Sequence, residues 1–171
     1  MAEFRKMTMG EVAEVAGLPK ETLRARINRG VVEARKSPGW ARFNLPSVVK
    51  ICVHAEMMRR VGIEEVAIKA ADFISESVHD FCKRPPYRIK RQGLIDGNYL
   101  FFRRDDHGFW HMFRADSLEN AMQKLGSYAF DSQYLEASGF YFLNASTIAD
   151  WVLDRIFDIQ GIDGNEAVAR K

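Results

Sequence analysis

The first thirty residues contain two closely spaced sets of helix start and stop signals. Thr8-Met-Gly-Glu11 fits a capping box, in which a Thr side chain and a Glu three residues later satisfy each other's free backbone amides. Gly17 is a stop signal for this helix, Pro19 suits the first position of a second helix, and Gly30 ends the second. Apolar residues follow helical spacing at Met9, Val12, Ala13 and Ala16, and then at Leu23 and Ile27. Two short helices this close together predict a helix-turn-helix.

A hairpin and a third helix are expected next. Val31-Val32 suits a short strand, residues 33–39 form a basic turn with Pro38-Gly39 at its tip, and residues 40–43 alternate as a return strand. Such a hairpin beside a helix-turn-helix is a wing. Leu45-Pro46 opens a helix to about Val61 that Gly62 closes, and its expected buried side is Val48, Val49, Ile51, Cys52, Ala55 and Met58. The stretch from about Thr8 to Val66 is therefore predicted to be a winged helix-turn-helix.

The second helix supplies the candidate DNA contacts. With Leu23 and Ile27 buried, Arg24 and Arg26 project from opposite flanks and are candidate phosphate contacts. The candidates for reading base edges are Lys20, Glu21, Ala25 and Asn28, and Thr22 is included among the DNA-contact residues. On the wing, the candidates are Arg35, Lys36 and Arg42, placed to meet the backbone or the minor groove. The alternative is a surface helix with solvated charges, and the order of the surrounding elements favours DNA.

The charge is divided unevenly along the chain. Residues 1–104 carry 20 Lys/Arg against 12 Asp/Glu, whereas residues 105–171 carry 5 against 11. A net +8 followed by a net −6 indicates one half that faces a polyanion and another that faces something else. Chance clustering is the alternative to this interpretation.

The same N-terminal residues resemble the opening of the MerR family of regulators. The resemblance rests on three stretches: residues 9–17 (Met-Gly-Glu-Val-Ala to Gly), residues 22–24 (Thr-Leu-Arg) and residues 30–32 (Gly-Val-Val). The segments 39–43 and 59–66 resemble the family's wing and its turn into a fourth helix. The resemblance implies a homodimeric, sequence-specific transcriptional regulator that binds double-stranded DNA. The chain departs from the family pattern at Ala25-Arg26 and at Ala41, so the family's operator contacts are not carried over. Phage terminase small subunits and excisionases share a similar winged unit.

A connecting segment follows, over residues 67–96. Residues 63–81 form one expected helix, which either dimerises, as the resemblance implies, or packs against the C-terminal half. Pro85 and Pro86 exclude helix from the basic stretch 83–91, which either adds phosphate contacts with Arg103 and Arg104 or is a solvated hinge.

The C-terminal half, residues 97–160, is expected to be a small ββα–βα unit before a polar tail at 161–171. Strands are predicted at 98–103, 109–114 and 140–143, with a turn at 105–108. A helix begins at the Asp116-Ser-Leu-Glu119 capping box and ends at Gly126, residues 127–138 are irregular, and Ser146 caps a last helix. The fold class is α+β. Most of the twenty aromatic residues lie here, where they form a core, line a pocket for an apolar or planar effector, or make a dimer interface.

Catalysis, a cofactor and a metal site are not expected. No phosphate loop, nucleophile elbow or full ligand set is present, and the pairs His107/His111 and His79/Cys82 fall short of the four ligands of a structural zinc. Cys52 and Cys82 are expected to be free thiols of a cytoplasmic, nucleoid-associated protein without signal peptide or membrane span. The function predicted is a MerR-like transcriptional regulator, bacterial or phage. The alternatives are a phage or plasmid DNA-packaging or recombination accessory protein and a protein-interaction module. A small molecule or protein is the expected partner of the C-terminal unit.

Overall fold

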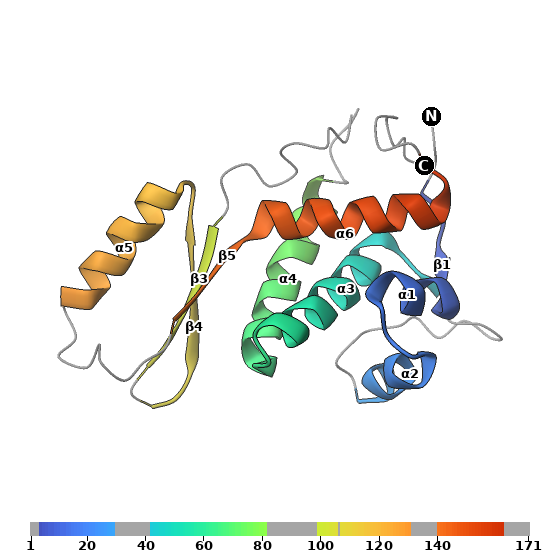
Figure 1. Ribbon diagram of the computed structural model, residues 1–171, viewed down its shortest axis with the longest axis horizontal. Coiled ribbons are helices and arrows are strands. Elements are labelled where there is room, and N and C mark those ends of the chain that lie inside the picture. Colours follow the sequence, from blue (N-terminus) through green and yellow to red (C-terminus); the bar gives the residue numbers. More distant parts are fainter. Residues whose placement is uncertain (1–3, 30–41, 82–98, 106, 131–139, 163–171) are drawn as a thin grey trace.

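The computed structural model describes residues 4–29, 42–81, 99–105, 107–130 and 140–162. Within these residues, six helices and two small antiparallel sheets form a mixed helix-and-sheet fold, which agrees with the expected α+β class (Figure 1). A helical layer lies at one end of the molecule, a three-stranded sheet lies beside it, and one further helix covers the other face of the sheet. The predicted domain boundaries after residues 66 and 96 stay predictions.

The first helices begin and end near the predicted signals. Helix α1 (Met9–Ala16) starts at a complete capping box, in which the Glu11 amide donates to Thr8 Oγ1 at 3.3 Å and the Thr8 amide donates to Glu11 Oε2 at 2.7 Å. Gly17 ends it with a φ of 60°, a conformation that favours glycine. Helix α2 (Lys20–Asn28) follows, and Pro19 is its N-cap residue and not, as predicted, its first helical residue.

A short sheet at the N-terminus was not predicted. Strand β1 (Met7–Thr8) pairs antiparallel with β2 (Arg42–Phe43), so that Met7 lies opposite Phe43. The end of the predicted return strand is therefore a strand, but its partner here is the segment before α1. The predicted strand at Val31-Val32 and the tip of the wing, residues 33–39, lie outside the described residues.

Helices α3 (Leu45–Arg60) and α4 (Glu64–Phe81) form the centre of the helical layer. The Asn44 side chain caps α3 by accepting from the Ser47 amide at 3.0 Å, and Gly62, with a φ of 72°, lies in the turn to α4. Residues 51–57 are all buried, because α1, α4 and α6 pack around α3. Every predicted core residue of α3 is buried except Met58, which is half-buried.

The three-stranded sheet contains β3 (Tyr99–Arg104), β4 (Trp110–Ala115) and β5 (Phe140–Asn144) in the order β4-β3-β5. Its two faces have separate roles because successive side chains of a strand alternate. Leu100 and Phe102 belong to the main core with the helical layer, whereas Phe101 packs with Ala115 and Ala121 under α5. The hairpin turn is closed by the Asp105 amide, which donates to the Phe109 carbonyl at 2.8 Å.

The last two helices differ in detail from the prediction. Helix α5 (Leu118–Phe130) continues four residues past Gly126, so residues 127–130 are helical and not irregular. Helix α6 (Ala145–Gln160) is capped by Asn144, whose side chain accepts from the Thr147 amide at 3.1 Å, and not by Ser146. Strand β5 therefore runs directly into α6.

Helix α6 crosses the helical layer and packs against α1, α3 and α4 (Figure 1). At its C-terminal end the Gln160 side chain donates to the Arg5 carbonyl at 2.9 Å. One continuous core therefore contains side chains from α1, α3 and α4 together with Val152, Ile156 and residues of β3.

Candidate nucleic-acid interface

Helix α2 is attached to the rest of the molecule by few side chains. The turn before it is fixed by Gly17 and by the Leu18 amide, which donates to the Ala13 carbonyl at 2.9 Å. Leu23 is the one fully buried side chain of α2, and Ile27 is half-buried against the same core. Most of the helix surface is therefore available to a partner.

The predicted contact residues of α2 lie on this exposed surface, with two exceptions. Lys20, Glu21, Arg24, Ala25 and Asn28 are exposed, whereas Thr22 and Arg26 are half-buried. On strand β2, Arg42 is exposed, while the predicted wing contacts Arg35 and Lys36 lie outside the described residues. The structure thus brings the helical candidates together on one short helix.

The side chain of Arg26 makes a specific contact with α3. Its Nη1 lies 3.1 Å from Nδ1 of His54, a side chain that is 5% exposed. Burial, and then the nearby Arg26 charge, lower the pKa of His54 below its usual 6.5. His54 was not predicted as a site residue, although the sequence contains one signal: a histidine within the apolar run Ile51-Cys-Val-His-Ala55 needs a polar partner.

Two further cations, Arg59 and Arg60, lie at the C-terminal end of α3, and Arg59 lies next to the turn between α1 and α2. Arg59 and Arg60 pair with the buried Glu56 carboxylate at 2.6 and 2.5 Å. Arg59 also donates to the Ala16 carbonyl at 3.5 Å and remains about half exposed. The position of Arg59 beside this turn depends on the tertiary fold, so the sequence alone did not indicate it.

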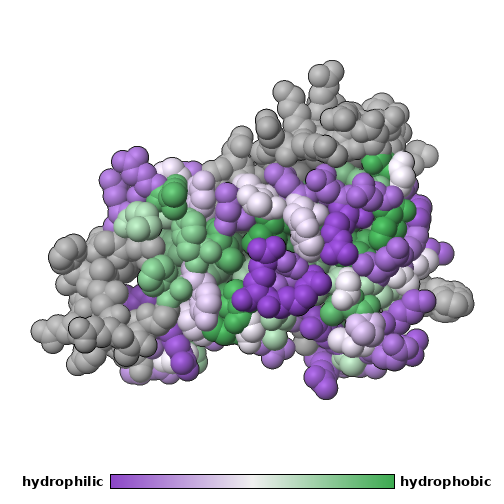
Figure 2. All heavy atoms as spheres, in the orientation of Figure 1, coloured by the Kyte–Doolittle hydropathy of each residue, from purple (hydrophilic) through white to green (hydrophobic). Residues whose placement is uncertain are grey.

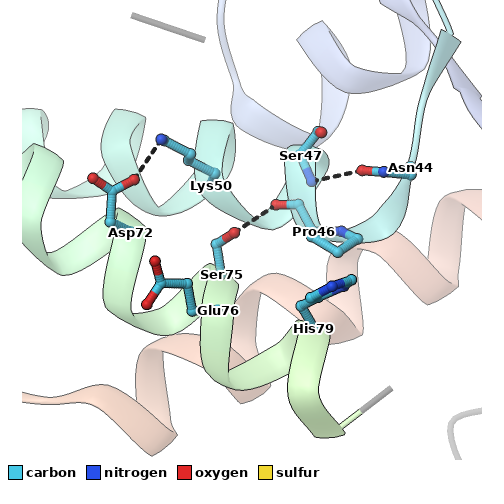
Figure 3. Close-up of a pocket in the computed structure, with 8 residues that line it drawn as sticks. All are labelled: Asn44, Pro46, Ser47, Lys50, Asp72, Ser75, Glu76 and His79. Atoms are coloured by element: carbon cyan, nitrogen blue, oxygen red, sulfur yellow. Dashed lines mark hydrogen bonds and ion pairs between the residues drawn. The ribbon is translucent and has the colours of Figure 1, made fainter. Parts of the chain in front are cut away.

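A polar hollow of about 260 Å³ lies between α3 and α4 (Figure 3). Most of the polar groups that line it form ion pairs or hydrogen bonds with one another. Lys50 pairs with Asp72, and Ser75 Oγ donates to the Pro46 carbonyl at 3.1 Å. The N-terminus of α3 offers little to an anion, since Pro46 has no N–H and Asn44 caps the Ser47 amide. The arrangement is that of a helix–helix contact.

A second hollow, of about 430 Å³, lies between α4 and β4. Aromatic and acidic residues share its lining, which is Lys69, Asp72, Phe73, Glu76, Trp110, His111, Met112 and Phe113. The Arg114 guanidinium lies 5.1 Å from the centre of the Phe73 ring, a cation–π contact. The contact between Arg114 and Phe73 therefore connects β4 to α4 beside this hollow.

The cysteine and histidine candidates take other roles where they are described. Cys52 is a buried thiol, and burial raises its pKa to about 12. His111 Nε2 lies 2.6 Å from Asp105 Oδ2, which lowers the pKa of that carboxyl. Cys82, which lies one helical turn from His79 in the sequence, is outside the described residues. In the described parts of the chain, no three His, Cys, Asp or Glu side chains gather as metal ligands.

The comparisons with known proteins leave the family open. No protein-family model matches the sequence, and no curated protein matches it significantly. None of the described helices has the length and apolar character needed to cross a membrane.

Proposed function

We propose that residues 8–66 form a winged helix-turn-helix that binds double-stranded DNA, and that the protein is a MerR-like, sequence-specific transcriptional regulator. The observation that carries the proposal is the surface of α2. One buried leucine, Leu23, attaches this helix to the core, and Lys20, Arg24 and Asn28 are exposed around it. A helix that enters the major groove needs this combination of a narrow buried side and an exposed polar side.

Three further features support the proposal. A capped eight-residue helix and a short turn precede α2, as in a helix-turn-helix. Arg42 and Arg59 add exposed cations from β2 and α3. The net charge of residues 1–104 is +8, which favours contact with phosphates.

The first experiment measures binding to a labelled duplex of about 30 base pairs, roughly three helical turns, by fluorescence anisotropy. If about six phosphates are contacted, affinity should fall about 10³-fold between 50 and 200 mM salt. Arg24→Ala should weaken binding, whereas Lys124→Ala, a cation of α5 at the opposite end of the molecule (Figure 1), should leave it unchanged. The proposal fails if no duplex binds, or if both variants bind as well as the wild type.

Footprinting of bound sites across the genome would separate regulator from accessory protein. Paired half-sites beside promoters fit a homodimeric regulator associated with the nucleoid, since dimers read two half-sites. Light scattering on the protein with and without such a site tests the dimer directly. A single clustered array of sites would instead identify the packaging or recombination protein.

One observation favours that second candidate. Four large apolar side chains of the C-terminal half are more than half exposed: Phe109, Leu118, Met122 and Phe140. Figure 2 shows apolar surface over α5 and the sheet on the face in view. Exposed apolar surface is typical of sites that recruit a protein partner. Retention of a partner by the wild type but not by Phe109→Ser/Phe140→Ser would support recruitment.

A further inference from the structure

His54 is a buried polar residue that the proposed DNA contacts leave unused. It lies in the middle of α3, and it makes the hydrogen bond described above to Arg26 of α2. Its other ring nitrogen, Nε2, is also buried and has no hydrogen-bond partner among the described residues. A buried polar atom without a partner destabilises the folded state, because it has lost its hydrogen bonds to water. An apolar residue at position 54 would not leave a buried polar atom without a partner. The presence of a histidine there therefore suggests that its hydrogen bond with Arg26 has a role of its own.

The chemistry of the pair fixes the protonation state of His54. A guanidinium only donates hydrogen bonds, so Nδ1 must accept and the ring proton must lie on Nε2. The charged groups that act on the ring are Arg26 of α2, Lys50 of α3, and Glu64 and Asp72 of α4. Burial and the two cations favour the neutral ring, and the two carboxylates oppose them. His54 is therefore a hydrogen-bond acceptor at neutral pH.

The acceptor restricts the direction of the Arg26 side chain. A guanidinium has five N–H donors in a rigid plane, and the bond to His54 uses one of them. Because His54 belongs to α3, this bond limits rotation of the Arg26 guanidinium and so fixes the directions of its other N–H donors. Arg26 is half-buried on the side of α2 that faces α3, whereas Arg24 is exposed. The two arginines therefore differ in how firmly they are oriented before any partner binds.

We propose that His54 is a positioning residue for DNA binding: it holds the guanidinium of Arg26 in the direction that meets a phosphate beside α2. This inference rests on the proposed function. The benefit is preorganisation, since ordering one flexible side chain on binding costs about 0.5–1.5 kcal/mol. That cost corresponds to about a two- to tenfold loss of affinity when the positioning group is removed.

The test measures duplex affinity and its salt dependence for variants at the two positions. His54→Leu should weaken binding about two- to tenfold with the salt slope unchanged, because Arg26 keeps its charge. Arg26→Ala should weaken binding and reduce the slope by about one phosphate contact. The double variant should bind no more weakly than Arg26→Ala alone. His54→Asn, whose Oδ1 can accept where Nδ1 did, should bind more tightly than His54→Leu.

A structural role would give a different pattern. If His54 only stabilised the fold, His54→Leu would lower helicity and the salt slope together, and its effect would add to that of Arg26→Ala. Ser75→Ala is the matched control, since it removes another hydrogen bond of a buried side chain, on α4, and should not change affinity.

The failure of this inference is distinguishable from failure of the proposed function. The positioning role is wrong, and DNA binding stands, if Arg24→Ala weakens binding and His54→Leu does not. The same holds if the losses of binding free energy in Arg26→Ala and His54→Leu add in the double variant. If the wild type binds no duplex, both are wrong.

Discussion

Replacement of Leu23 by alanine tests how α2 is attached to the core. Leu23 is completely buried and is the one fully buried side chain of α2. The change removes three carbons, worth about 0.8 kcal/mol each as buried groups, and it leaves a cavity. Leu→Ala changes in cores cost about 2–5 kcal/mol. Because α2 lies at the edge of the helical layer and can settle into the gap, we expect a loss of about 3 kcal/mol.

Thermal and urea unfolding measure this loss. For a chain of this size, 1 kcal/mol shifts Tm by about 2–4 °C, so Leu23→Ala should lower Tm by roughly 6–12 °C. Leu118→Ala, on the exposed side of α5, is the matched control and should stay within about 0.5 kcal/mol of the wild type.

Hydrogen exchange locates the effect. Amides of residues 20–28 should lose protection in Leu23→Ala before those of α3, since Leu23 is the one fully buried side chain of α2. A loss below about 1 kcal/mol, with unchanged protection of α2, would refute the attachment through Leu23.

Other predictions concern single groups. Thr8→Ala should cost about 1 kcal/mol in urea unfolding because it removes half of the capping box, whereas the exposed Thr147→Ala should cost less. The Arg5 side chain, which donates to Glu11, and the Thr8 amide lower the Glu11 pKa from 4.5 to about 2; the stability lost in Glu11→Gln should therefore be full above pH 4.5 and vanish as pH falls to about 2. The lowered pKa of His54 means that the unfolded chain binds more protons, so wild-type stability should fall as pH drops below 6.5, and His54→Leu should lack this component. The Cys52 thiol, with its pKa raised to about 12, should resist alkylation in the native protein and react once it is unfolded.

The features best predicted from the sequence are those that depend on residues close together in the chain, namely helix ends and strands. The capping box at Thr8 and the stop at Gly17 act over three or four positions, so their effect is visible without the fold. The strands at 99–104, 110–115 and 140–144 were found from alternation and turn residues. The start of α6 was missed by two residues because Asn144 and Ser146 are both good N-cap residues, and the sequence does not rank them.

The sequence could not predict contacts between distant segments. Strand β1 forms because Met7 meets Phe43, and two residues are too few to show a periodic pattern. Helix α3 is buried over its whole central part, since three helices surround it, so its apolar pattern gave no indication that His54 faces Arg26. Of the candidate interface, the exposed residues of α2 were predictable from the helical wheel, but the contact between Arg26 and His54 was not.

The position of α6 links the two halves of the chain more closely than separate segments in the sequence suggest. Strand β5 enters α6 without a loop, because Asn144 both ends the strand and caps the helix. The same helix then packs on α1, and Arg155 donates to the Glu14 carbonyl at 3.5 Å. The sheet and the helix that precedes α2 are therefore connected through α6, with no loop between β5 and α6. Coupling between two sites requires a shared element, and α6 contacts both β3 and α1.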